Sequence, residues 1–113
     1  MEPRALTERE RAVLDALLAV DFEGVEELRR QAAEAQVVGA CGCGCPSVDF
    51  QDGVGMTVRV DGAVRGTYDA LFLYTFGDGR LGGIEWAGVE AKPAEFPPPE
   101  LLDISVPPPP SST

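Results

Sequence analysis

The sequence predicts a single α+β domain over residues 1–106, with an N-terminal helix pair packed on an antiparallel sheet of about four strands. Two observations carry this prediction. Between residues 8 and 35, apolar side chains recur at the spacing of amphipathic helices. Residues 56–60 alternate apolar and polar side chains, and the Asp-Gly pairs at 61–62 and 78–79 are turn signals beside strand-like segments.

The helix pair is predicted from two N-terminal caps and two apolar stripes. In Thr7-Glu8-Arg9-Glu10 the threonine hydroxyl can accept from the Glu10 N–H, whose carboxylate can reach back to the cap. The stripe that follows consists of Val13, Leu14, Leu17 and Leu18. Asp21 is the predicted N-cap of the second helix. Its stripe consists of Phe22, Val25, Leu28, Ala32 and Ala35. Together the stripes predict an αα-hairpin.

A run of cysteines alternates with glycine in Cys41-Gly42-Cys43-Gly44-Cys45-Pro46, after the β-type pair Val37-Val38. Side chains two positions apart on a strand point the same way, so we expect Cys41, Cys43 and Cys45 to line one strand face. Pro46 lacks a backbone N–H and therefore limits this strand to an edge or an end.

Three interpretations of the cysteine run are open. Reduced cysteines can be small buried hydrophobes, while glycines admit a close neighbour on the opposite face. Alternatively, Cys41, Cys43 and Cys45 can bind Zn²⁺ or Cu(I), with Asp49, another carboxylate or a second molecule's cysteine as the fourth zinc ligand. Thiol redox chemistry is the third interpretation, although its familiar motif is Cys-x-x-Cys at a helix start. We adopt the structural interpretation, so no cofactor is expected.

Residues 70–76 and 81–87 are predicted to form a hairpin around a two-residue type I′ turn at Asp78-Gly79. This turn sets the pairs Phe76 with Leu81, Tyr74 with Gly83, Leu73 with Ile84, and Leu71 with Trp86. One face then carries Leu71, Leu73, Ile84 and Trp86, which suits the helices. The other carries Phe72, Tyr74, Phe76 and Leu81, with Gly83 leaving space for a ring.

The second face of this hairpin is unusual because a solvated sheet face is normally polar. We therefore expect Phe72, Tyr74, Phe76 and Leu81 to contact a partner, a second copy of the chain in a homodimer, or the segment Phe96–Val106. Residues 107–113 are rich in proline and serine and are predicted to be a disordered tail.

The charge of the chain restricts its partners. Among 113 residues, 19 are acidic and 9 are basic, which gives a net charge of −10. Such a chain repels phosphate backbones and anionic lipid, so we expect no nucleic-acid or membrane binding and favour a basic protein partner. No apolar run approaches the roughly 20 residues of a membrane span, and Met1-Glu2-Pro3-Arg4 lacks the start of a signal peptide. We expect a cytoplasmic protein.

The residue types also argue against catalysis. The chain contains no histidine, which is the usual activating base for a serine or cysteine nucleophile. With 19 acidic residues, close carboxylate pairs arise by chance, so none is assigned an acid–base role. We expect a non-enzymatic binding protein.

Three segments carry a resemblance to known proteins: residues 37–48, which include the cysteine run; Leu81-Gly82-Gly83-Ile84-Glu85-Trp86; and Phe96-Pro97-Pro98. In these the chain resembles short uncharacterised proteins of GC-rich bacteria with a Cys-Gly-Cys-Gly-Cys-Pro run, and this resemblance implies no activity. In size and charge the chain is also similar to acidic toxin-immunity proteins. That likeness implies an inhibitor or immunity-like module that binds a basic protein.

Overall fold

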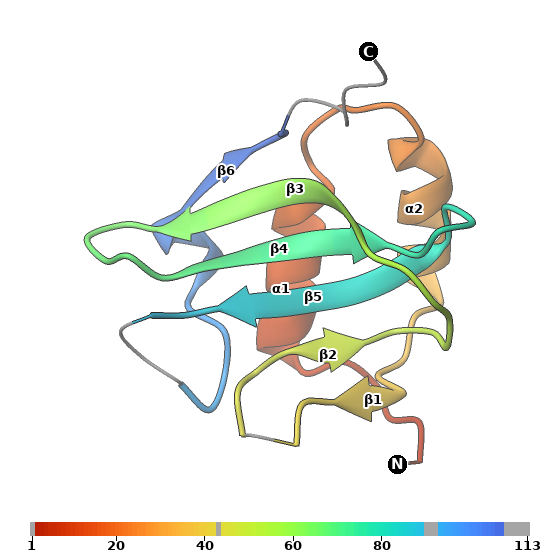
Figure 1. Ribbon diagram of the computed structural model, residues 1–113, viewed down its shortest axis with the longest axis horizontal. Coiled ribbons are helices and arrows are strands. Elements are labelled where there is room, and N and C mark those ends of the chain that lie inside the picture. The colour runs from red at the N-terminus through yellow and green to blue at the C-terminus, as the bar shows by residue number, and fades with distance from the viewer. Residues whose placement is uncertain (1, 43, 90–92, 108–113) are drawn as a thin grey trace.

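The computed structural model describes residues 2–42, 44–89 and 93–107. Two helices, α1 (Glu8–Leu17) and α2 (Val25–Ala33), precede the strands. The strands are β1 (Gly39–Ala40), β2 (Val48–Asp49), β3 (Thr57–Val64), β4 (Ala70–Thr75), β5 (Leu81–Ala87) and β6 (Leu102–Ser105), with a short 3₁₀ turn at Pro99–Leu101. They form one antiparallel sheet in the order β1-β2-β5-β4-β3-β6 (Figure 1). The α+β prediction is confirmed, but the described sheet has six strands rather than about four.

The start of α1 confirms the predicted capping box. The Thr7 hydroxyl accepts from the Glu10 N–H at 3.1 Å, and the Thr7 N–H donates to the Glu10 carboxylate at 2.8 Å. Arg4 donates to both oxygens of the same carboxylate, at 2.8 and 3.0 Å. Burial acts to raise the pKa of Glu10, but these hydrogen bonds outweigh it and hold the pKa below the ordinary value. Glu10 thus ties the N-terminal segment to the helix.

The start of α2 differs from the prediction. Its N-cap is Gly24, at φ +89°, and not Asp21, which instead lies 3.2 Å from the Arg29 guanidinium. Glycine tolerates this left-handed conformation, which lets the chain reverse directly before Val25. The helix begins only after this reversal, so the predicted cap, Asp21, lies outside it.

The hairpin of β4 and β5 confirms most of the predicted register: Tyr74 pairs with Gly83, Leu73 with Ile84, and Leu71 with Trp86. Its loop contains three residues, 77 to 79, because the Phe76 N–H donates to the Arg80 carbonyl at 2.9 Å. Gly79, at φ +89°, takes the left-handed position in this loop. The predicted two-residue turn is therefore wrong. A bulge at Gly82 restores the register, and Leu81 pairs with Thr75 rather than with Phe76.

The core lies between the helices and one face of the sheet. From the sheet it receives Leu71, Leu73 and Ile84, as predicted, together with the half-buried Trp86. Leu81 also belongs to this core, so its predicted position on the opposite face is wrong. The extra residue at the bulge shifts the side-chain alternation by one position and turns Leu81 toward the helices.

The segment Phe96–Val106 has a different place from the predicted one. Phe96 is 1% exposed and packs in the helix-side core, where its carbonyl accepts from Arg9 at 2.8 Å. β6 then pairs with β3 at the sheet edge, and Leu102 joins the same core. This segment extends the sheet and does not cover its second face. Residues 108–113 of the predicted tail lie outside the described residues.

Candidate functional site: the open face of the sheet

One face of the sheet lacks a covering layer of secondary structure. Both helices lie behind the sheet in Figure 1, and no helix or strand among the described residues crosses its front. We call this front surface the open face. Because the strands are in defined register, the side chains that share this surface can be assigned from the strand pairs.

A phenylalanine flanked by two carboxylates lies across the middle of the open face. Asp61 of β3 pairs with Phe72 of β4, and Phe72 pairs with Glu85 of β5. Directly opposite residues on neighbouring strands share a face, so the ring has one acidic side chain on each side. All three side chains are half-buried. We refer to Asp61, Phe72 and Glu85 as the acidic–aromatic row.

The adjacent row consists of alanines. Ala63 of β3 pairs with Ala70 of β4, which pairs with Ala87 of β5. Ala63 and Ala87 are exposed, and Ala70 is half-buried. This alanine row forms a low apolar strip beside Phe72, against which another chain can approach closely.

Two of the predicted contact residues are buried instead of exposed. Tyr74 is 4% exposed, and its hydroxyl donates to Asp49 of β2. A Cβ at Gly82 would lie 2.3 Å from the Tyr74 ring, so Gly82 rather than the predicted Gly83 leaves the space for the ring, while Gly83 lies against the Tyr74 hydroxyl. The Tyr74 side chain is therefore part of the sheet's own packing.

Phe76 is the second buried member of the predicted contact set, at 6% exposure. Gly53 packs against its ring so closely that an added Cβ would lie 2.5 Å away. The Arg80 guanidinium carbon lies 5.4 Å from the ring centroid. The loop before β3 and the hairpin arginine therefore cover Phe76, which leaves Phe72 as the accessible aromatic of the predicted set.

The carboxylates of the open face lie in a negative environment. Burial raises the pKa of Glu85, and the charge of Asp49 raises it further, while a hydrogen bond with Ser47 acts in the opposite direction. Burial, the hydrogen bond to Asp49 and its charge raise the pKa of Tyr74. The phenol thus stays protonated and keeps donating to Asp49. Acidic side chains thus gather on this face.

The arginines of the chain do not neutralise the acidic–aromatic row. Every arginine except Arg59 lies within 4.0 Å of a carboxylate, and those carboxylates are on the helices, the turns, β6 or the segment before it. Arg59 donates to the Thr75 hydroxyl at 3.0 Å. Within the described part of the chain, no ion pair includes Asp61 or Glu85. The described arginines are thus engaged with groups other than Asp61 and Glu85, and the pair of Arg65 with Asp103 adjoins the alanine row, because Asp103 pairs with Ala63.

The described residues of the cysteine run do not continue the predicted strand. β1 ends at Ala40, and the Gly44 N–H donates back to the Cys41 carbonyl at 3.5 Å, with Gly44 at φ +94°. Glycine permits this reversal where the alternation predicted an extended strand. Cys41 is exposed and so does not act as a buried hydrophobe.

The other two cysteines differ from Cys41. Cys45 is half-buried, and its thiol donates to the Ser47 hydroxyl at 3.4 Å. Cys43 lies outside the described residues. Among the described residues, no three acidic or cysteine side chains converge as metal ligands would.

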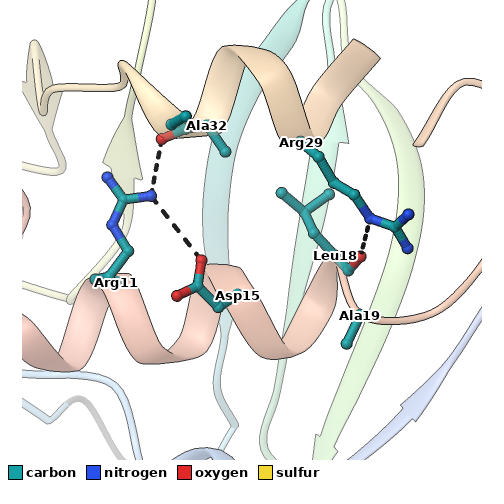
Figure 2. Close-up of a pocket in the computed structure, with 7 residues that line it drawn as sticks. Arg11, Asp15, Leu18, Ala19, Arg29 and Ala32 are labelled. Carbon is teal, nitrogen blue, oxygen red and sulfur yellow. Dashed lines mark hydrogen bonds and ion pairs between the residues drawn. The ribbon is translucent and has the colours of Figure 1, made fainter. Parts of the chain in front are cut away.

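A groove of about 350 Å³ separates α1 from α2, and two arginines lie in it (Figure 2). Arg11 donates to the Ala32 carbonyl and Arg29 to the Leu18 carbonyl, each at 2.8 Å. The last carbonyls of a helix lack partners within the helix, and a cation there also complements the helix dipole. Each guanidinium therefore caps the opposite helix, and we assign the groove a structural role.

The sequence placed Phe72 on the second face of the hairpin, as observed, but did not single out the acidic residues beside it. The predicted hairpin register already implied that Glu85 lies opposite Phe72, since Leu71 and Leu73 were correctly paired. Asp61 was not predictable in this way, because the pairing of β3 with β4 includes a bulge at Arg59.

Comparison of the chain with protein-family models, with curated proteins and with solved structures found no match. In the described ranges, neither helix has the length and apolar character that crossing a bilayer requires.

Proposed function

We propose that this protein is a non-enzymatic interaction module whose open face binds a basic segment of another protein. The acidic–aromatic row carries the proposal: Phe72 supplies an apolar centre, and Asp61 and Glu85 supply charge on both sides. Protein interfaces commonly combine a central aromatic anchor with a polar rim. The occupant is basic because Asp61 and Glu85 have no arginine partner among the described residues.

A second copy of the chain is a poorer occupant than a basic partner. A homodimer through the open face would bring the same carboxylates of two chains together, each chain carrying a charge of −10. Like charges placed opposite each other at an interface disfavour association. An inhibitor or immunity-like role also favours a basic partner over a second copy of the chain, because such a role requires a basic target protein.

The test uses a defined probe, an amphipathic peptide of lysine and leucine, with binding measured by calorimetry and by NMR chemical shifts. We expect binding to shift residues of β3, β4 and β5 and to weaken as salt rises from about 0.05 to 0.5 M, where the screening length falls well below about 10 Å. The double variant Asp61→Asn/Glu85→Gln should bind roughly tenfold more weakly, since it removes two charges at the contact.

The matched control is Glu23→Gln/Glu34→Gln, which removes the same charge from exposed positions outside the sheet. It should bind nearly as well as the parent chain. If both double variants lose the same affinity, the peptide senses net charge alone and the proposed site is wrong. Light scattering that shows a dimer persisting in high salt would favour a second copy as the occupant and would also overturn the proposal.

A further inference from the structure

We infer that the group recognised at the acidic–aromatic row is an arginine side chain of the partner, seated on the Phe72 ring between Asp61 and Glu85. This inference rests on the proposed docking function and names the chemistry of its occupant. The inference predicts that the chain binds arginine more tightly than lysine, a preference that net charge alone would not produce.

The geometry of the row suits a planar cation. Neighbouring strands lie about 4.8 Å apart, so the two carboxylates stand on opposite sides of the ring. A guanidinium can stack on an aromatic face while its N–H groups, which lie in its plane, donate to carboxylates at the ring's margins. An ammonium group is compact and strongly hydrated, and it makes fewer directed contacts of this kind.

The same chain already uses this combination of groups within its own fold. Arg80 lies over the Phe76 ring with its guanidinium carbon 5.4 Å from the centroid, and its Nε donates to Asp78 at 2.7 Å. Phe76 is 6% exposed, so the arrangement covers an aromatic ring on the open side of the sheet. Phe72 has a carboxylate on each side but no arginine of the chain among its described contacts. The partner would supply the missing cation.

The alanine row provides room for the rest of the arginine and for the backbone that carries it. Ala63, Ala70 and Ala87 lie one row from Phe72 and present only methyl groups. Long charged side chains commonly lay their methylene stems on such apolar surfaces. An arginine approaching over this row can therefore place its stem on the alanines and its guanidinium on the ring.

The experiment compares two peptides of equal length and charge, one of arginine and leucine and one of lysine and leucine, by calorimetry at the same salt concentration. The parent chain should bind the arginine peptide about fivefold more tightly, the ratio that corresponds to about 1 kcal/mol of cation–π interaction. Phe72→Leu should reduce this ratio to about one while retaining binding of the lysine peptide. Phe72→Tyr, which keeps an aromatic face, should preserve the ratio.

The outcomes distinguish failure of the arginine inference from failure of docking itself. If the parent chain binds both peptides equally, and Asp61→Asn/Glu85→Gln weakens both, docking stands and the arginine inference is wrong. An arginine preference that survives in a folded Phe72→Leu chain places the recognition elsewhere and also overturns the inference. If neither peptide binds, docking and arginine recognition fail together. Thermal melting of each variant establishes that it is folded.

Discussion

Replacing Gly83 by alanine should separate β2 from the rest of the sheet. An added Cβ would lie 2.2 Å from the Val48 carbonyl oxygen and 3.0 Å from both the Asp49 Cα and the Tyr74 hydroxyl. A carbon and a carbonyl oxygen in contact normally lie about 3.3–3.6 Å apart, so the strands must part by about 1 Å. The obstacle is backbone, which cannot rotate away as a flexible side chain would.

The cost can be estimated from what this displacement breaks. Phe50 donates to the Gly82 carbonyl at 2.8 Å beside the paired residues of β2 and β5, and Tyr74 donates to Asp49. Leaving a buried hydrogen-bonding group without its partner costs about 1–3 kcal/mol, and overpacking costs a similar amount. We therefore expect Gly83→Ala to lower the free energy of unfolding by about 2–4 kcal/mol.

Urea unfolding followed by the fluorescence of Trp86 measures this loss. The matched control is Gly42→Ala, because nothing lies within 4 Å of an added Cβ there and Gly42 is not among the glycines with positive φ. The control should change stability by less than about 0.5 kcal/mol. Equal stability of the two variants would refute the close approach of β2 to β5.

Three further predictions concern single positions outside the sheet interior. Gly79→Val should cost about 1–3 kcal/mol in urea unfolding, because Gly79 has φ +89° and a β-branched residue resists that conformation; an unchanged midpoint would argue against the left-handed loop position. Glu10→Gln should lower the melting temperature at neutral pH, since Arg4 and the helix cap hold the Glu10 pKa below its ordinary value of 4.5. A lowered pKa gives stability that is present above the ordinary value and lost as pH falls through the lowered pKa, so the melting temperatures of the two chains should converge in acid; a constant difference at every pH would contradict this. Cys41→Ser should change stability by less than about 0.5 kcal/mol, because Cys41 is exposed; a large loss would restore the buried interpretation.

The sequence predicted those parts of the fold that depend on local chemistry. The capping box at Thr7 and the pairing of Leu73 with Ile84 are set by residues close together in the chain, and both are confirmed. Gly24 as the N-cap of α2 could not be predicted in the same way, because a glycine cap has no side chain that signals it. Asp21, three residues before Gly24, is a stronger N-cap signal in the sequence but a misleading one.

The errors at the site have a non-local cause. The bulge at Gly82 is favoured by the Tyr74 ring and by the strand β2, neither of which is adjacent to it in sequence. That single extra residue turned Leu81 into the core and removed it from the predicted contact surface. Phe76 is buried because a loop more than twenty residues earlier in the chain packs over its ring. The periodicity of the hairpin sequence cannot predict a contact with so distant a segment.

The distribution of charge on the two sides of the sheet has an energetic consequence. On the helical side, arginines cap helix ends and pair with carboxylates, so acidic residues there support the fold. On the open face, burial and Asp49 raise the pKa of Glu85, which means that the folded chain disfavours the ionised carboxylate relative to the unfolded chain. This cost is present above the raised pKa and disappears as pH falls below the ordinary glutamate value. A cation bound beside Phe72 would offset the same cost at neutral pH. The feature that weakens the isolated fold is therefore the one that favours a basic partner.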